Sequence, residues 1–220
     1  MTCQFGHDSH ETITAPTDLG PMVVFDTRLY DTDLPGWCPG RHNVCDRLRV
    51  EGRWEPHDSN SIRQVLEDGD RSGLVVDFGA NVGWYTLMAA RLGYSVVAIE
   101  GDPDFVDLLR QNVELQGLER LVTIRHDWVD EDYVFVLPDG DVELIKTDLE
   151  GSDGYAVEAC WGFVDRVNHW YLELSPELGM DCPPIVAKLA EAGFKAWYSD
   201  DRLFDGDFSH GQINLRFSRR

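Results

Sequence analysis

The stretch VVDFGANVGWYT (residues 75–86) places an acid, two glycines and an asparagine directly after an apolar run. The run predicts a buried strand, and a helix is expected to begin near Val82 or Gly83. Gly79 permits a backbone conformation that a β-carbon disfavours, and Gly83 permits close approach of backbone or ligand. Free N–H groups at the start of such a helix favour a carboxylate or a phosphate. The stretch is therefore a candidate binding turn.

This turn departs from the two common phosphate-binding patterns. A dinucleotide turn reads G-x-G-x-x-G, whereas residues 79–83 read GANVG and Trp84 stands at the position of the third glycine. The bulk of an indole there argues against a pyrophosphate, so nicotinamide and flavin cofactors are disfavoured. No lysine follows the glycines as in G-x-x-x-x-G-K-[ST].

Glu100 ends the apolar stretch SVVAIE (residues 95–100). An acid at the end of the second strand, about 20 residues beyond a glycine turn, hydrogen-bonds ribose hydroxyls in nucleotide-binding sheets. The alternative is a helix cap, but the following Asp102 and Pro103 already supply a cap and a first helical residue. A ribose-binding role is therefore favoured.

A second cluster of acids lies in KTDLEG (residues 146–151), where Asp148 and Glu150 follow another apolar run. Alternation along a strand would send both side chains to one face, together with Lys146, which could pair with one of them. Two acids facing a site could position a hydroxyl, stabilise a cation or act as general base. The alternative is an ordinary helix N-cap with acids in its first turn.

Other candidates are weaker. Glu173 ends the stretch WYLEL and could lie on the rim of the same pocket. His126 and His169 flank expected strands, and a lone histidine is more often structural than catalytic.

Two stretches, CQFGHDSH (residues 3–10) and CPGRHNVC (residues 38–45), combine cysteine with histidine, but neither has the second knuckle of a tetrahedral zinc site. Their candidate ligands would be Cys3, His7, His10, Cys38, His42 and Cys45. Polar loops are the favoured reading, and no metal is expected.

Strands alternate with helices from residue 73 onward, which predicts crossover units and a mostly parallel sheet. A final pair without an intervening helix predicts a hairpin that places an antiparallel strand near the sheet's end. The expected strands are 73–79, 94–100, 121–128, 142–150, 168–175, 194–200 and 212–218, and the expected helices are 84–93, 102–117, 151–163 and 183–193.

The first part of the chain is expected to be organised differently. Residues 1–20 predict a loose tail, and residues 21–57 predict a β-rich extension or lid with β-like stretches at 22–30 and 47–54. A helix is expected to start at Asp58 or Ser59 and to stop at Gly69. Residues 58–220 would then form the main domain.

The charge balance is strongly acidic: 40 Asp and Glu against 19 Lys and Arg give a formal net charge of −21. Such a surface repels phosphate, so neither nucleic acid nor an anionic membrane is an expected partner. Solubility explains the acidity, and a host with a salty cytoplasm is an alternative. The five cysteines are scattered, and residues 1–20 are polar without an apolar stretch. A cytoplasmic location with reduced thiols is expected.

Four stretches together resemble the FkbM-type S-adenosylmethionine-dependent methyltransferases: VVDFGANVGWYTLMAA, VVAIEGDP, ELIKTDLEGSDGYAVEA and WYLELSPE. RWEPHDSNSIRQVLEDGD is similar to that family's approach to the first strand. The resemblance covers about residues 52–217. Asp153 departs from it, because glutamate is expected there, and the N-terminal 50 residues match no pattern.

The resemblance implies a class I methyltransferase fold, Rossmann-like, with a seven-stranded mostly parallel sheet and helices on both faces. It implies S-adenosyl-L-methionine as cofactor and assigns residues to it. Glu100 would bind the ribose, Asp127 would accept from the adenine amino group, and Trp128 would cover the ring, although a core or surface tryptophan is nearly as plausible. Tyr85 and Thr86 open the helix where hydroxyl and N–H groups would receive the methionine carboxylate. The turn that shapes the methionine pocket would comprise Asp77, Gly79, Ala80, Asn81 and Gly83.

The expected activity is O-methylation of a hydroxyl on a sugar or other small metabolite, with Asp148 and Glu150 as catalytic residues. An N- or O-methyltransferase acting on protein or RNA is the first alternative, and the acidic surface counts against RNA. A catalytically silent cofactor-binding module is the second alternative, which the intact acids beside an intact glycine turn disfavour.

Overall fold

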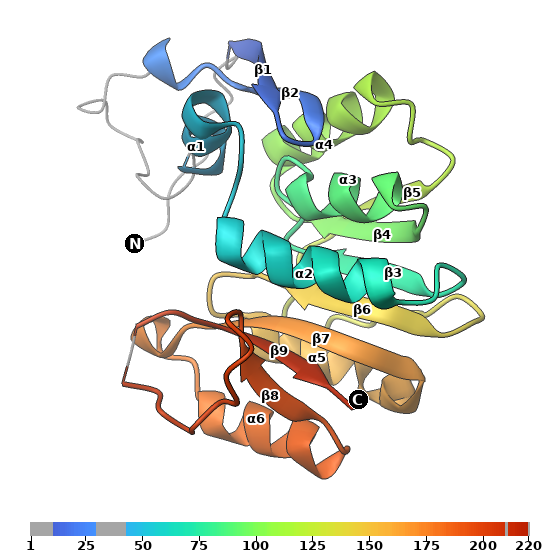
Figure 1. Ribbon diagram of the computed structural model, residues 1–220, viewed down its shortest axis with the longest axis vertical. Helices are drawn as coiled ribbons and strands as arrows, with labels where there is room; N and C mark the ends of the chain where they lie inside the picture. Colours follow the sequence, from blue (N-terminus) through green and yellow to red (C-terminus); the bar gives the residue numbers. More distant parts are fainter. Residues whose placement is uncertain (1–10, 30–42, 210, 220) are drawn as a thin grey trace.

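The chain folds around one large β-sheet (Figure 1). A computed structural model describes residues 11–29, 43–209 and 211–219. Seven strands lie in the order β5-β4-β3-β6-β7-β9-β8, and β9 runs antiparallel to both of its neighbours. The strands are β3 (Leu74–Phe78), β4 (Ser95–Glu100), β5 (Val122–His126), β6 (Val142–Thr147), β7 (Val167–Leu174), β8 (Lys195–Tyr198) and β9 (Ile213–Ser218). This architecture confirms the predicted sheet, including the antiparallel strand near its end.

The central strands are buried on both faces, which explains their continuous apolar runs. Alternate residues enter two separate cores: Val75 and Leu144 pack on one face, whereas Val76 and Ile145 pack on the other. Consecutive apolar residues of one strand thus enter opposite faces of the sheet, as period-two alternation requires.

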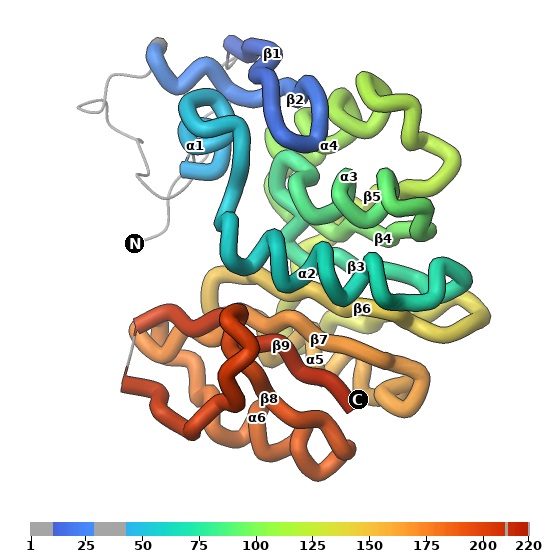
Figure 2. The backbone as a smooth tube through the Cα atoms, viewed as in Figure 1, coloured from blue at the N-terminus to red at the C-terminus, as the bar shows by residue number. Residues whose placement is uncertain are grey.

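Helices cover both faces of the sheet. The first face carries α1 (Asn43–Glu51), α2 (Pro56–Asp68), α3 (Trp84–Arg91) and α4 (Pro103–Leu115), and the second carries α5 (Asp153–Cys160) and α6 (Cys182–Glu191). Short 3₁₀ turns occupy Thr27–Leu29, Trp161–Arg166 and Pro176–Leu178. Figure 2 traces the chain through α1 into α2, which crosses the sheet beside α3.

Trp84, the residue that replaces the third glycine of a dinucleotide turn, joins two of these helices. Its indole is buried in the first turn of α3, and its Nε1–H donates to Ser59 Oγ of α2 at 2.8 Å. Trp84, whose bulk prevents the close helix–strand contact of a dinucleotide turn, therefore fixes α2 against α3.

The N-terminal extension is more ordered than the sequence indicated. Residues 1–20 were expected to be a loose tail, but Thr12–Thr17 form β1, which pairs antiparallel with β2 (Gly20–Phe25). Asn112, fully buried on α4, anchors this hairpin by accepting from Val23 N at 2.5 Å and donating to Val23 O at 2.9 Å. Apolar packing adds to this anchor, since Met22, Val24 and Phe25 of the hairpin belong to the same core as α4.

Two local predictions were wrong. Residues 47–54 were expected to be β-like, but residues through Glu51 belong to α1, because Cys45 and Leu48 lie three residues apart and are both buried. Arg47–Glu51 and Arg49–Asp46 ion pairs on the exposed side suit a helix as well. The following helix, α2, begins at Pro56 rather than at Asp58 or Ser59, because proline is favoured at the first helical position.

Candidate functional site

The glycine turn lies at the carboxyl end of β3 and is held by the neighbouring strand. Gly79 N and Ala80 N both donate to Ile99 O of β4, at 2.9 and 3.0 Å. Gly79 has φ +75°, and a β-carbon on it would lie 1.9 Å from the Asp148 carbonyl oxygen. Gly83, with φ +98°, caps α3. Backbone therefore packs directly on backbone here, and only glycine fits at position 79.

Asp77, the last polar residue of β3, carries an unsatisfied buried oxygen. Only 1% of Asp77 is exposed, and its Oδ2 accepts from Thr86 Oγ1 at 2.6 Å. Its Oδ1 has no hydrogen-bond partner among the described residues, although Lys146 Nζ lies 3.7 Å away. A buried acceptor without a donor is costly, so this oxygen is available to a ligand donor.

Glu100 reaches back from the end of β4 to the glycine turn. Its Oε2 accepts from Asn81 N at 2.7 Å, and its Oε1 accepts from Asp102 N at 2.8 Å. Burial raises the pKa of this carboxyl group, partly offset by those N–H donors. Asp102 itself caps α4 by accepting from Asp104 N, so capping is not the role of Glu100. Each Glu100 oxygen keeps a lone pair for a ribose hydroxyl.

Trp128 stacks on the backbone that follows Glu100. The indole is 66% exposed, yet a β-carbon on Gly101 would lie 2.7 Å from its Cδ2 atom. Asp127 is exposed beside it, with Tyr133 OH donating to its Oδ2 at 3.4 Å. His126 lies 3.1 Å from Gly101 O through Nε2. An aromatic face and an exposed carboxylate thus lie next to the proposed ribose-binding acid, where an adenine amino group would need them.

Two predicted cofactor contacts do not fit the observed bonding. Thr86 is fully buried and donates its hydroxyl hydrogen to Asp77, so that hydroxyl cannot receive a carboxylate. Tyr85 donates to Glu55 Oε2 at 2.7 Å. Burial and the nearby Glu55 carboxylate raise the pKa of Tyr85 well above its ordinary value. Only the backbone N–H groups of this first turn remain candidates.

Glu55 is a site residue that the sequence did not reveal. It lies in the segment between α1 and α2, in the left-handed region with φ 38°, an uncommon conformation for glutamate. Burial raises the pKa of its carboxyl group to about 7, and the Asp148 carboxylate adds to the effect. A charged residue before a proline carries no motif, so spacing alone could not have identified it.

Asp148 and Glu150 lie beyond the strand instead of within it. Strand β6 ends at Thr147, so alternation along the strand does not orient these two side chains as expected. Glu150 is exposed, with φ 50°, whereas Asp148 is half-buried. Lys146 Nζ lies 3.2 Å from Asp148 Oδ2 and donates to Gly79 O at 3.4 Å, so the expected pairing of Lys146 is observed.

The acids at this edge of the sheet influence one another. Burial raises the pKa of Asp153 to about 7, and the Asp148 carboxylate adds to it. Burial raises the pKa of Glu173 further, again with help from Asp148. Although Glu150 as a whole is exposed, partial loss of water around its carboxyl group, together with the Asp148 carboxylate, raises its pKa. Asp148 is thus the common neighbour of three acids, with Lys146 as its ion-pair partner.

A Glu55→Gln variant is expected to flatten the pH dependence of stability. The pKa of Glu55 is raised from 4.5 to about 7, so the folded state binds a proton that the unfolded state releases, and stability falls as pH rises across that interval. Removing the Glu55 carboxyl group should reduce the fall in the free energy of unfolding between pH 5 and pH 8 by about 2 kcal/mol. Urea denaturation at pH 5 and at pH 8 measures this change in the free energy of unfolding.

The matched control is Glu67→Gln, an exposed glutamate on α2. We expect it to leave the difference between the two pH values unchanged within about 0.5 kcal/mol. Equal pH dependence in Glu55→Gln and the parent protein would contradict the assignment.

Several other features lie apart from this edge. His169 Nε2 lies 3.7 Å from Glu143 Oε1 near the opposite ends of β6 and β7, away from the glycine turn. Cys45 is buried, whereas the other candidate ligands of the two cysteine–histidine patches lie outside the described residues. Within the described ranges, no group of three or more His, Cys, Asp or Glu could hold a metal ion. No helix in the described part of the chain is long and apolar enough to cross a membrane.

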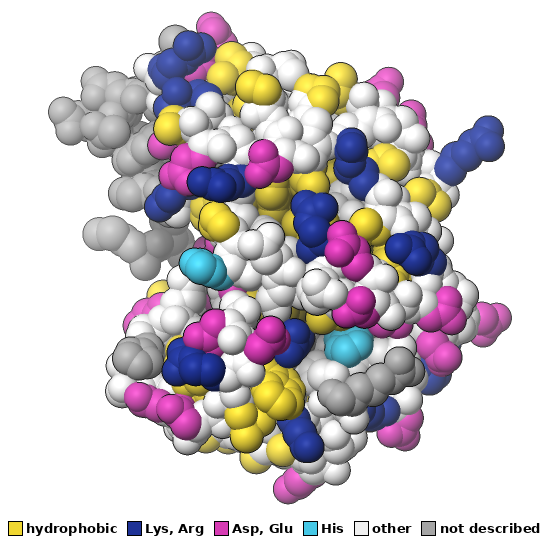
Figure 3. Space-filling view, viewed as in Figure 1, with side chains coloured by type: hydrophobic (Ala, Val, Ile, Leu, Met, Phe, Trp, Pro, Cys, Tyr) yellow, Lys and Arg dark blue, Asp and Glu magenta, His cyan; other side chains and the backbone are white. Residues whose placement is uncertain are grey.

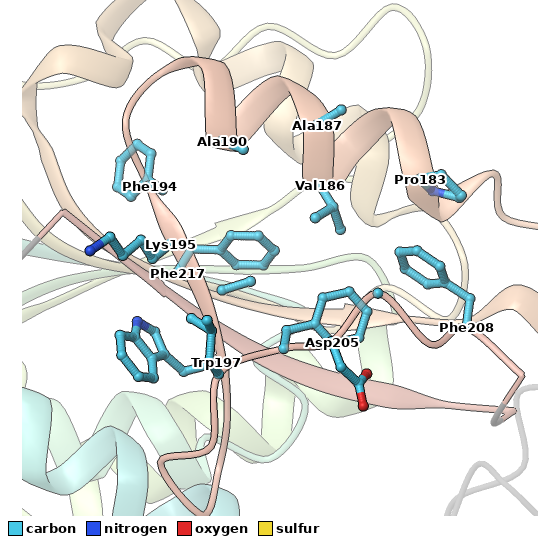
Figure 4. Close-up of a pocket in the computed structure, with 14 residues that line it drawn as sticks. Pro183, Val186, Ala187, Ala190, Phe194, Lys195, Trp197, Asp205, Phe208 and Phe217 are labelled. Atoms are coloured by element: carbon cyan, nitrogen blue, oxygen red, sulfur yellow. The ribbon is translucent and has the colours of Figure 1, made fainter.

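A cavity of about 620 Å³ lies between α6, β8 and the loop at residues 203–208 (Figure 4). Its lining is mostly apolar and includes Val186, Trp197 and Phe208. None of the predicted cofactor residues lines it, so it is distinct from the site at the glycine turn.

Comparison with known proteins identifies methyltransferases. Residues 51–136 match the model of the TRM5/TYW2 methyltransferase domain. Over 78 residues the chain is 32% identical to a probable ribosomal RNA small subunit methyltransferase A from Methanosphaera stadtmanae, covering 34% of this chain and 29% of that relative's length.

Solved structures share the fold at low identity. A TehB-like S-adenosylmethionine-dependent methyltransferase from Corynebacterium glutamicum is 14% identical with a TM-score of 0.57, covering 83% of this chain and 99% of that one. A putative RNA methyltransferase from Pyrococcus horikoshii is 18% identical with a TM-score of 0.50, covering 74% of this chain and 84% of that one.

These comparisons overturn the expectation that nucleic acid is not a partner. That prediction was wrong because the matched relative is described as a ribosomal RNA methyltransferase and a structural neighbour as an RNA methyltransferase. Net charge sums the whole surface, whereas contact with nucleic acid depends on the local distribution of charge. On the face in Figure 3, basic side chains lie among the acidic ones.

The comparisons support an S-adenosylmethionine-dependent methyltransferase without supporting the FkbM family specifically. The observed site fits such a cofactor, because it offers an unsatisfied buried carboxylate oxygen, a backbone cradle at Gly79 and an acid at the ribose position. The chain has the fold of the class I methyltransferases, and the cofactor that this fold and the matched domain imply is S-adenosyl-L-methionine.

Proposed function

We propose that this protein is an S-adenosylmethionine-dependent methyltransferase that acts on RNA. The observation that carries the proposal is the 32% identity over 78 residues to a probable ribosomal RNA methyltransferase. The domain match at residues 51–136 supports it, since that range includes the glycine turn, Glu100, Asp127 and Trp128. The likeness therefore covers the proposed cofactor site.

The cofactor-binding residues act in two groups. The turn from Gly79 to Gly83 and the unpaired Asp77 oxygen hold the methionine half, with Asp77 accepting from its ammonium group. Glu100 accepts from the ribose hydroxyls, while Asp127 and Trp128 hold the adenine. When bound, the cofactor supplies an activated methyl group on a sulfonium, so the protein mainly aligns the acceptor and excludes water.

Asp148 and Glu150 serve the acceptor. Both follow β6, at the carboxyl edge that also carries the glycine turn of β3, and Asp148 N donates to Phe78 O at 3.1 Å. A carboxylate there accepts a hydrogen bond from an N–H or O–H acceptor group and takes its proton as the methyl group is transferred.

The activity test compares acceptors directly. Purified protein with tritium-labelled S-adenosylmethionine is incubated with total RNA, and with a panel of glycans and small alcohols. Label in nuclease-sensitive material supports the proposal, and label only in small molecules overturns it in favour of the second candidate. Release of S-adenosylhomocysteine with no acceptor found is not expected, and absence of any release would indicate a silent binding module.

O-methylation of a sugar or metabolite hydroxyl is the second candidate. The D-x-E-G stretch at Asp148–Gly151 favours it, because this stretch carries the resemblance to FkbM-type enzymes.

A Glu100→Gln variant is expected to bind S-adenosylmethionine about 10-fold to 100-fold more weakly, because a charged acceptor to the ribose hydroxyls is replaced by a neutral one. Isothermal titration calorimetry measures the change. Glu119→Gln, an exposed glutamate near β5, is the control and should bind as the parent does. Equal affinity in Glu100→Gln and the parent would remove the ribose assignment.

A further inference from the structure

Glu173 is a buried acid, next to last in β7, beside the proposed acceptor site. Thr147 of β6 pairs with Leu172 of β7 in parallel register, so Asp148, which follows β6, comes next to Glu173, which is still paired with Asn214 of β9. Only 3% of Glu173 is exposed. Ser175 Oγ donates to its Oε1 at 3.1 Å, and the Asp148 carboxylate helps to raise its pKa. Two carboxyl groups on neighbouring strand positions with little solvent around them disfavour two negative charges, so one of them is expected to keep a proton.

Charged groups reach this pair from several elements. Asp148 and Glu150 come from the segment after β6, and Asp153 comes from the start of α5; all three act on Glu173. Lys146 of β6 pairs with Asp148. Glu55, from the segment before α2, faces Asp148. Since Lys146 stabilises the anion of Asp148 rather than that of Glu173, the proton belongs on Glu173.

Burial supports the same assignment. Asp148 is half-buried and has Lys146 Nζ at 3.2 Å, whereas Glu173 is almost fully buried and accepts from the Ser175 hydroxyl. Burial and the neighbouring carboxylates raise the pKa of Glu173 well above its ordinary value. An ionised carboxylate is stable only where donors or cations compensate for lost water, which favours Asp148 as the anion.

We propose that Asp148 and Glu173 hold one proton between them, with neutral Glu173 donating to ionised Asp148 and thereby orienting it toward the methyl acceptor. Asp148 is then a catalytic residue, because it touches the acceptor, and Glu173 is a positioning residue. This role deepens the proposed function and rests on it.

The proton balance of the transfer is simple. The acceptor N–H or O–H forms its new bond to the methyl carbon, the carbon–sulfur bond breaks, and its electron pair stays on sulfur in S-adenosylhomocysteine. The acceptor's proton passes to Asp148 Oδ1 or Oδ2. Glu173 keeps its own proton throughout, which prevents a second anion from forming next to Asp148.

The first test observes the proton without any acceptor. Protein labelled with carbon-13 at the glutamate δ-carbon is titrated by NMR. At pH 8 we expect one resonance with the chemical shift of a protonated carboxyl group. That resonance should be lost in Glu173→Gln and kept in Glu143→Gln, a buried glutamate on β6 that pairs with Asn168. A spectrum without a protonated resonance at pH 8, or one unchanged in Glu173→Gln, overturns the proposal.

Asp148→Asn provides a second measurement on the same resonance. Removing the neighbouring negative charge should move the titration midpoint of Glu173 to lower pH. An unchanged midpoint overturns the pairing, even if Glu173→Gln does not fold.

The second test uses turnover. Glutamine keeps a neutral donor, so Glu173→Gln should retain kcat within about threefold, whereas Glu173→Ala and Asp148→Asn should each lose about 10²-fold or more. An equally large loss in Glu173→Gln would show that the ionised form is required, and would overturn the proposal. If RNA is not methylated, the proposed function fails, while the NMR titration still decides the proton assignment.

Discussion

Gly79→Ala is expected to destabilise the protein by about 3 to 5 kcal/mol and to abolish binding of S-adenosylmethionine. Two costs add at this position. Gly79 has φ +75°, which disfavours any β-carbon, and that carbon would lie 1.9 Å from the Asp148 carbonyl oxygen and 2.9 Å from its carbonyl carbon. Both atoms belong to the backbone of the segment that carries Asp148 and Glu150, the acids proposed to serve the acceptor, so relief of the clash should displace these two residues.

The Gly117→Ala variant separates the cost of the left-handed backbone conformation from the cost of the steric clash. Gly117 also has a left-handed conformation, with φ +67°, but a β-carbon there has no atom within 4 Å. The Gly117→Ala variant should therefore lose about 1 to 2 kcal/mol of stability, and its affinity for the cofactor should be unchanged. Urea denaturation and calorimetry on both variants make the comparison. Equal losses of stability in the two variants would contradict the close approach of the Asp148 carbonyl group to Gly79.

Lys146→Met is expected to cost about 3 to 5 kcal/mol at pH 8, because it leaves buried carboxylates without their cation. The ammonium group lies 3.7 Å from Asp77 Oδ1 and 3.2 Å from Asp148 Oδ2. Burial alone would lower the pKa of Lys146, but the carboxylates of Asp148, Asp77 and Glu55 outweigh burial and raise it. The loss of stability in Lys146→Met should be smaller at pH 5, where a proton on one of the neighbouring carboxyl groups can replace the missing positive charge.

Lys188→Met is the matched control, since Lys188 pairs with Glu158 at the surface of the protein. A surface pair contributes little, so this variant should lose about 1 kcal/mol or less at either pH. Similar losses for the two lysines would contradict the central electrostatic role given to Lys146.

The sequence predicted the sheet because its strands alternate with amphipathic helices and because its turn residues have specific backbone requirements. Gly79 and Glu100 could be located from spacing along the chain, and the structure places both at the glycine turn. By contrast, Thr86 was misjudged, because its position in the helix gives no sign that its hydroxyl hydrogen is already donated to Asp77.

Residue spacing could not predict those features of the site that depend on contacts between segments far apart in the sequence. Glu55 reaches Tyr85 across 30 positions of sequence. The proton-sharing contact of Asp148 with Glu173 requires the register of two parallel strands. The exclusion of nucleic acid as a partner was also wrong, because net charge is a property of composition, whereas a binding surface is a property of arrangement.

Asn112 ties the N-terminal hairpin to the cofactor turn. Its amide donates to Val82 O at 2.8 Å as well as bonding Val23 of β2, so one buried group spans the hairpin, α4 and the turn. A fragment trimmed to residue 58 would lose Val23 as a partner for this amide, and would also lose Glu55. We therefore expect removal of residues before 58 to weaken binding of S-adenosylmethionine at the glycine turn, although the hairpin lies outside that turn.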